Sequence, residues 1–143
     1  MILMWRGQGI AAAMPDVQVT IFDHGKQIAV ASPEVTVREL VARCEERLQT
    51  ADGILRLAVT PALIQDIQDK ELAVEIRYRE PKDFLIPFNH QTLHPLRLLI
   101  PLTGEFAGGI TTVFHGTTQY GAGPYRNKRD TEDLVKLVTQ LER

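Results

Sequence analysis

The chain has 143 residues, of which 16 are Lys or Arg and 18 are Asp or Glu, so the net charge at pH 7 is −2. This near-balance excludes the basic surface of a dedicated nucleic-acid-binding protein. A hydrophobic fraction of 44% is typical of a globular domain, and no apolar run approaches the roughly 18 residues of a membrane-spanning helix. We therefore expect a single-domain cytoplasmic protein that contacts neither nucleic acid nor membrane.

The N-terminal segment has no secretory pattern, because its apolar residues are few and are interrupted by Arg6 and Gly7. Periodic patterns begin only after Met14. We expect residues 1–13 to be an appendage and residues 14–143 to form one domain. If the appendage is ordered, its apolar residues must be buried against the domain or a second copy, which makes self-association one hypothesis.

The first half of the chain predicts a hairpin followed by a helix. Alternating apolar residues in VQVTIF (17–22) indicate a half-buried strand, and Gly25 suits the turn to a second strand, QIAVA (27–31). Thr36 and Glu39 fit a T-x-x-E capping box at the start of a helix. The apolar stripe of this helix consists of Val37, Leu40, Val41, Cys44 and Leu48.

Further elements follow from residue 55 to the end. LRLAV (55–59) alternates like a third strand, and Thr60 before Pro61 predicts the start of a short helix. In LAVEIRYRE (72–80) the alternation predicts a strand whose polar face, with Glu75, Arg77 and Arg79, is exposed to water. An excursion loop at 81–95 separates this strand from LRLLIPL and from ITTVFH, the last expected strand. A closing helix begins near Asp130.

This order predicts an α+β fold: a mainly antiparallel sheet of about five or six strands with two or three helices on one face. The opening hairpin and capped helix resemble the first half of a β-grasp, or ubiquitin-like, unit. That resemblance is to architecture and carries no function. The chain also ends in Leu141-Glu142-Arg143, without the Gly-Gly terminus that ubiquitin-type conjugation uses.

The stretch FHGTTQYGAGPYRN (114–127) concentrates the residues most suited to binding. His115, Tyr120, Tyr125 and Arg126 are the candidate ligand-binding or partner-binding residues, and glycines between them indicate tight turns. His115-Gly116-Thr117 resembles the H-G-T element with which some ADP-ribosyltransferases hold NAD. That family also requires a stacking tyrosine and a glutamate separated by substantial structure, for which the remaining chain is too short.

Three other stretches or residues resemble sites of known kinds. An anion cradle in GAGPYRNKR has neither the P-loop nor the dinucleotide-binding spacing, and Asp130 competes for the helix amides. His90 and His94 have a possible metal-ligand spacing, but neighbouring prolines disfavour a helix between them. Cys44 lies on an apolar stripe, where a thiol is inert. We therefore predict no catalytic residues, no metal and no cofactor.

Two function hypotheses remain. The first is a non-enzymatic domain that acts through protein–protein contacts, as an adaptor, accessory subunit or inhibitor-like partner, using the 114–127 loop as a contact surface. The alternative is a small-ligand-binding or nucleotide-binding domain, with transferase or hydrolase activity as an option. In that case His115, Tyr120, Tyr125 and Arg126 should converge on one concave pocket.

Overall fold

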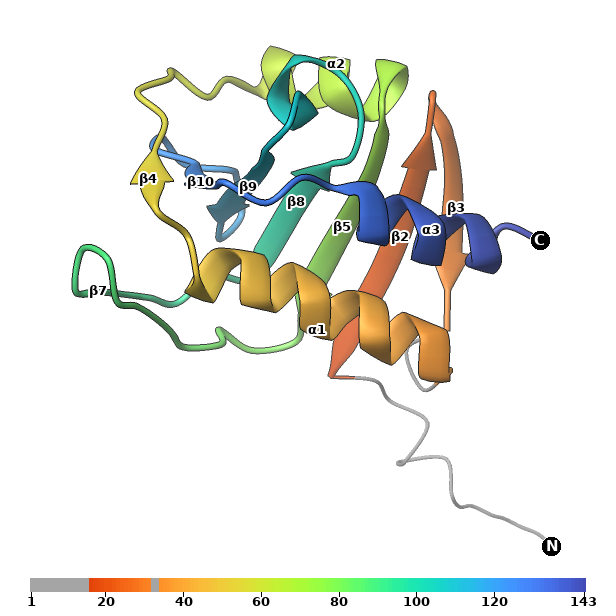
Figure 1. Cartoon of the computed structure of the whole chain (residues 1–143), viewed down its shortest axis with the longest axis horizontal. Coiled ribbons are helices and arrows are strands. Elements are labelled where there is room, and N and C mark those ends of the chain that lie inside the picture. Colours follow the sequence, from red (N-terminus) through yellow and green to blue (C-terminus); the bar gives the residue numbers. More distant parts are fainter. Residues whose placement is uncertain (1–15, 32–33) are drawn as a thin grey trace, which may run out of the picture.

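The computed structural model describes residues 16–31 and 34–143, so the expected appendage at 1–13 lies outside the described residues. The centre of the molecule is a seven-stranded sheet in the order β3-β2-β5-β8-β9-β10-β4, and a separate two-stranded sheet pairs β6 with β7. Figure 1 shows the large sheet with two helices in front of it and the third helix at the top of the view.

The strands of both sheets are β2 (Val17–Asp23), β3 (Lys26–Val30), β4 (Gly53–Ile54), β5 (Leu72–Tyr78), β6 (Phe84–Ile86), β7 (Gln91–Leu93), β8 (Arg97–Pro101), β9 (Thr111–Gly116) and β10 (Tyr125–Asn127). The helices are α1 (Val35–Gln49), α2 (Pro61–Lys70) and α3 (Glu132–Leu141), with a 3-10 turn at η2 (Glu105–Ala107).

Neighbouring strands in the large sheet are antiparallel at every described pairing. This confirms the α+β class and the mainly antiparallel sheet. The predicted count of five or six strands is wrong, since the large sheet has seven. β4 and β10 have two and three residues, too few to show an alternating pattern. The β-grasp likeness is not confirmed: β2 lies between β3 and β5, antiparallel to both.

One face of the sheet is covered by α1 and α3. Apolar side chains of these helices meet inward residues of β2, β5 and β8, such as Ile21, Val74 and Leu98. Cys44 is fully buried among them. This larger apolar cluster anchors α1 and α3 to the same face.

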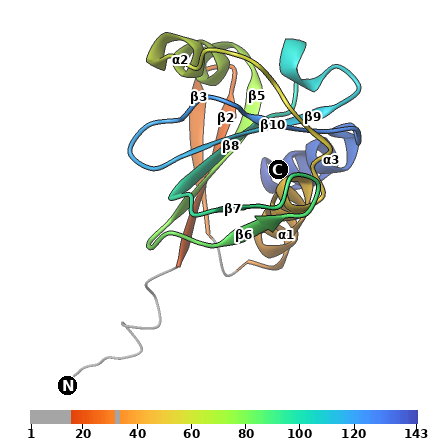
Figure 2. The same ribbon diagram turned by 90° about the vertical axis from the view of Figure 1, so that its left-hand side faces the viewer.

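The opposite face is covered by α2, as the side view in Figure 2 shows. Ile67 of α2 packs with Phe22, Leu99 and Phe114 of the sheet, and these residues belong to a second, smaller apolar cluster. The prediction of helices on one face only is therefore wrong. The physical reason is that the central strands carry buried residues on both faces, so both faces need a cover.

Residues 55–59 do not form the predicted strand. β4 ends at Ile54, and the following segment runs to α2 without ladder pairing, while Leu57 and Val59 pack against the smaller apolar cluster. Every second residue of this segment is partly buried because Leu57 and Val59 cover the face of the sheet.

Helix starts differ in how well the sequence predicts them. Thr60 caps α2 as expected: its Oγ1 accepts from the backbone N–H of Leu63 at 3.1 Å, and Pro61 takes the first helical position. At α1 the capping box does not form. The helix begins two residues earlier, with Glu34 as the N-cap, and the Glu34 carboxylate accepts from the N–H of Thr36 at 3.0 Å.

The expected excursion loop at 81–95 has structure of its own. β6 and β7 form a small hairpin, and Phe84 and Ile86 are buried in the cluster beneath α1. Leu85, between them, is 61% exposed. The segment therefore closes one end of the larger apolar cluster.

Candidate functional site

The stretch 114–127 is divided between two strands and the turn that joins them. β9 ends at Gly116, Tyr120 forms an isolated bridge with Gly116, and β10 begins at Tyr125. The four candidate residues consequently lie in three different places, and they do not converge on one pocket.

Tyr120 lies on the α2 face and is 9% exposed. Its hydroxyl donates to Glu75 Oε2 at 2.7 Å. Burial, reinforced by the negative charge of Glu75, raises the pKa of the Tyr120 hydroxyl far above its ordinary value. The hydroxyl therefore remains a hydrogen-bond donor throughout the physiological range.

His115 and Tyr125 lie together near the other face, with their ring centroids 5.4 Å apart. His115 Nε2 donates to the carbonyl of Gly123 at 3.2 Å, and Tyr125 Oη accepts from the amide of Asn89 at 3.1 Å. Burial lowers the pKa of His115 below its ordinary 6.5, so the ring is neutral at physiological pH. Tyr125 is 3% exposed. These contacts hold the turn and the β6–β7 hairpin in place.

Arg126 lies on β10 and pairs with Asp52 Oδ1 at 3.2 Å. Its guanidinium covers Gly53 of the neighbouring strand β4, where an added Cβ would come within 2.9 Å of it. Arg126 therefore links β10 to the segment of the edge strand β4. It does not line the cleft described next.

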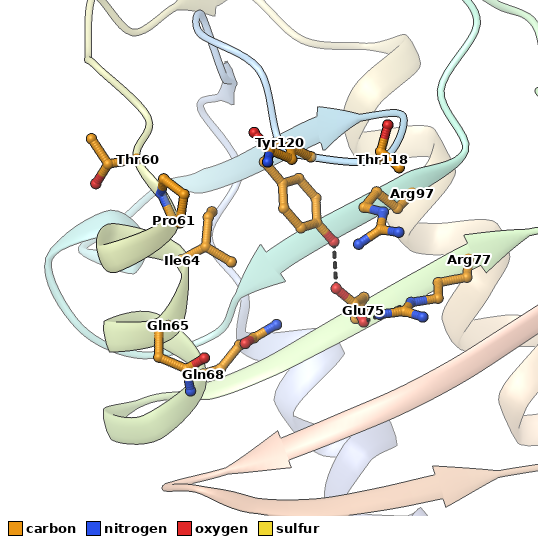
Figure 3. Close-up of a pocket in the computed structure, with 11 residues that line it drawn as sticks. Thr60, Pro61, Ile64, Gln65, Gln68, Glu75, Arg77, Arg97, Thr118 and Tyr120 are labelled. Atoms are coloured by element: carbon orange, nitrogen blue, oxygen red, sulfur yellow. Dashed lines mark hydrogen bonds and ion pairs between the residues drawn. The ribbon is translucent and has the colours of Figure 1, made fainter.

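A cleft of about 250 Å³ opens between α2 and the sheet, and we refer to it as the α2 cleft. Its lining residues are Thr60, Pro61, Ile64, Gln65, Gln68, Glu75, Arg77, Arg97, Thr118, Gln119 and Tyr120. Figure 3 shows the α2 side chains on one side, Arg77 and Arg97 on the other, and Tyr120 and Glu75 between them. Of the four candidate residues, only Tyr120 belongs to this cleft.

The charged groups of the α2 cleft are tightly organised. The buried carboxylate of Glu75 accepts from Tyr120 with one oxygen and from Arg77 Nε, at 3.2 Å, with the other. Arg97 of β8 places its guanidinium carbon 5.8 Å from the centroid of the Tyr120 ring. Nε of Arg97 is buried and has no hydrogen-bond partner among the described residues.

The prediction that the polar face of β5 is exposed to water is thus wrong at Glu75, whose exposed fraction is 3%. Sequence reasoning recognised that Glu75 and Arg77 share a strand face but not that α2 and Tyr120 cover it. Arg97 was missed entirely. The one local signal for it is a single arginine within the otherwise apolar run LRLLI (96–100).

The two histidines with a possible metal-ligand spacing, His90 and His94, do not form a metal site. His90 occupies a turn with φ of 58°, and His94 pairs with Asp83. Within residues 16–31 and 34–143, no three His, Cys, Asp or Glu side chains are grouped to hold a metal ion. None of the helices in these ranges has the length and apolar character needed to cross a membrane.

Comparison with protein-family models, with curated proteins and with solved structures found no match.

Proposed function

We propose that the chain is a small-ligand-binding domain that holds an anionic group of its ligand in the α2 cleft. The observation that carries this proposal is Arg97, whose guanidinium lies in the cleft with a buried Nε that no described residue satisfies. A buried donor without a partner is costly. Arg97 also has no ion-pair partner among the described residues, so an anionic ligand in the cleft can pair with the accessible part of its guanidinium.

Contacts between side chains also position the charged groups of the cleft before any ligand enters. Tyr120 and Arg77 occupy both oxygens of Glu75, and the Tyr120 ring supports the Arg97 guanidinium from the side. A preorganised guanidinium loses little conformational entropy when it binds, which favours affinity. Tyr120 is the residue that this proposal shares with the alternative hypothesis drawn from the sequence.

Thermal-shift measurements test the proposal with a panel of small carboxylates, phosphates and neutral amides. The wild-type chain should be stabilised by an anion in a concentration-dependent way, because a ligand that binds only the folded state raises Tm. Arg97→Gln should lose this response. Arg79→Gln is the matched control, since Arg79 is 56% exposed on its side chain and lies outside the cleft.

Salts also change protein stability without binding to a site, and the comparison of the two variants separates these effects. If every anion changes the Tm of wild type and of Arg97→Gln equally, no anion is bound by Arg97 and the proposal fails.

A second candidate, protein–protein contact in the cytoplasm, is favoured by exposed apolar side chains near β10. Phe88 is 40% exposed and packs 6.0 Å from the Tyr125 ring, and Ile54, 45% exposed, is the register partner of Tyr125. Replacing Phe88 and Ile54 with serine should weaken capture of a partner without unfolding the domain. Tyr120 and Tyr125 are unsuitable for this test, because both are buried. Unchanged capture would remove this surface from consideration.

A further inference from the structure

We propose that the anionic group is a single carboxylate on a ligand with a short apolar body, and that phosphate esters are discriminated against. This inference rests on the proposed function of the α2 cleft and specifies its ligand class. Three properties of the lining residues support it: their charge, the state of the α2 N-terminus, and the apolar wall.

The net charge of the cleft lining matches a ligand that carries one negative charge. Its charged lining side chains are Arg77, Arg97 and Glu75, which together carry one net positive charge. Arg77 already bonds Glu75 at 3.2 Å, so Arg97 is the guanidinium left for a ligand. A dianionic phosphate would bring an uncompensated second charge close to the buried Glu75 carboxylate, which repels it.

The N-terminus of α2 borders the cleft, but three of its first four residues have no free backbone N–H group. Phosphate sites at helix starts use free backbone N–H groups. Here Pro61 has no N–H, the N–H of Leu63 donates to Thr60 Oγ1 at 3.1 Å, and the N–H of Ile64 donates to the Thr60 carbonyl at 3.2 Å. A phosphate therefore lacks the ring of amides that normally surrounds its several oxygens.

The remaining wall provides contacts for an uncharged body. Pro61 and Ile64 of α2 and the ring of Tyr120 line the cleft, and the Gln65 and Gln68 amides stand beside them (Figure 3). The volume of about 250 Å³ lies below the roughly 300–1,000 Å³ of clefts that hold drug-sized ligands. An aliphatic monocarboxylate of a few carbons matches this combination of one guanidinium, apolar wall and limited space.

NMR titration of the full ¹⁵N-labelled chain at neutral pH tests the inference with butyrate, its neutral isostere butyramide, and ethyl phosphate. Butyrate should shift the Arg97 Nε–H signal and the amides of Thr118 and Gln119, and should bind at least about tenfold more tightly than either of the others. Arg97→Gln should abolish this binding. Arg97→Lys, which keeps the charge but loses the planar fork, should weaken it, and Arg79→Gln should leave it unchanged.

Each alternative outcome has a distinct meaning. If ethyl phosphate shifts the same signals with equal or higher affinity, the carboxylate inference is overturned while the proposed function stands. Equal binding of butyramide shows that charge is not recognised and overturns both. If none of the three compounds shifts signals of the α2 cleft, the proposed function itself fails. The unbound spectrum of each variant establishes that it is folded.

Discussion

At the scale of single residues, the fold depends on a few buried polar groups that join elements distant in sequence. Arg47 of α1 is completely buried, and it donates to the carbonyl of Asp130 at 3.0 Å and to the side chains of Thr111 and Asp133. One guanidinium thereby ties α1 to β9 and to the start of α3. Glu75 has the same role on the opposite face, where it joins β5 to the turn after β9.

The ion pair between Arg47 and Asp133 predicts an acid-sensitive contribution to stability. Burial opposes ionisation of Asp133, but hydrogen bonds from Arg43 and Arg47 and the charges of Arg47 and Arg129 outweigh it and lower the pKa below the ordinary 3.8. The contribution is therefore complete above the unfolded-state pKa and is lost as pH falls toward the folded-state pKa.

Urea denaturation at a series of pH values measures this effect. Asp133→Asn should show a shallower loss of unfolding free energy than wild type between about pH 5 and pH 3. Asp133→Ala leaves the buried Arg47 uncompensated and should cost about 3–5 kcal/mol at neutral pH. Identical pH dependence in wild type and Asp133→Asn would contradict the assigned role.

Cys44 is the second residue-scale prediction. Burial raises the pKa of its thiol to about 12, and it is the single cysteine of the chain. Because only the thiolate reacts, a thiol reagent should modify the native protein far more slowly than the urea-unfolded protein at mildly alkaline pH. Rapid modification without loss of structure would show that the thiol is accessible and that this face is packed differently.

At the scale of elements, the sequence predicts well where an element is long or locally encoded. The seven-residue strands β2 and β5 alternate clearly, and Thr60-Pro61 marks the start of α2 through its own side chains. β4 and β10 could not be predicted, because they exist only through pairing with each other and with β9. Residues 55–59 mimic a strand because they too bury alternate side chains.

The candidate site could be predicted only in part for a similar reason. Tyr120 stood out as an aromatic residue in a turn. Glu75, Arg77 and Arg97 acquire their roles from tertiary neighbours, since β5, β8 and α2 meet only in the folded chain. A polar strand face has the same sequence pattern whether water or a helix covers it.

The turn between β9 and β10 allows a test with matched glycines. A Cβ at Gly116 would lie 1.9 Å from the carbonyl oxygen of Gln119 and 2.7 Å from the Cα of Tyr120, whereas the nearest such atom at Gly121 is 3.9 Å away. Gly116→Ala should therefore lower the unfolding free energy by about 1–3 kcal/mol.

Gly121→Ala is the control and should stay within about 0.5 kcal/mol of wild type. The displaced backbone in Gly116→Ala should also break the hydrogen bond from Tyr120 to Glu75 and weaken anion binding in the α2 cleft. Equal stabilities of the two variants would mean that the close approach at Gly116 is not present in solution.

At the scale of the whole molecule, the sheet separates two apolar clusters that are unequal in size. The larger cluster lies under α1 and α3, and the smaller one lies under α2 beside the α2 cleft. Both draw residues from β2, β5 and β8, so neither cluster can form without the sheet. This arrangement predicts that the two faces unfold together.

Leu40 and Leu99 test this coupling, because each is fully buried and each belongs to a different cluster. Leu40→Ala and Leu99→Ala should each cost about 2–5 kcal/mol and should preserve a single unfolding transition. Circular dichroism and tyrosine fluorescence should give coincident curves. A separate early transition in Leu99→Ala alone would show that the α2 face opens independently.

The most direct test of the central claim, that the α2 cleft binds a carboxylate through Arg97, is a crystal structure of the full chain grown with butyrate. We predict density for the carboxylate against the Arg97 guanidinium, with the alkyl chain along Ile64 and the Tyr120 ring. The claim would be contradicted by a cleft that stays free of butyrate at saturating concentration, or by butyrate bound only at other arginines.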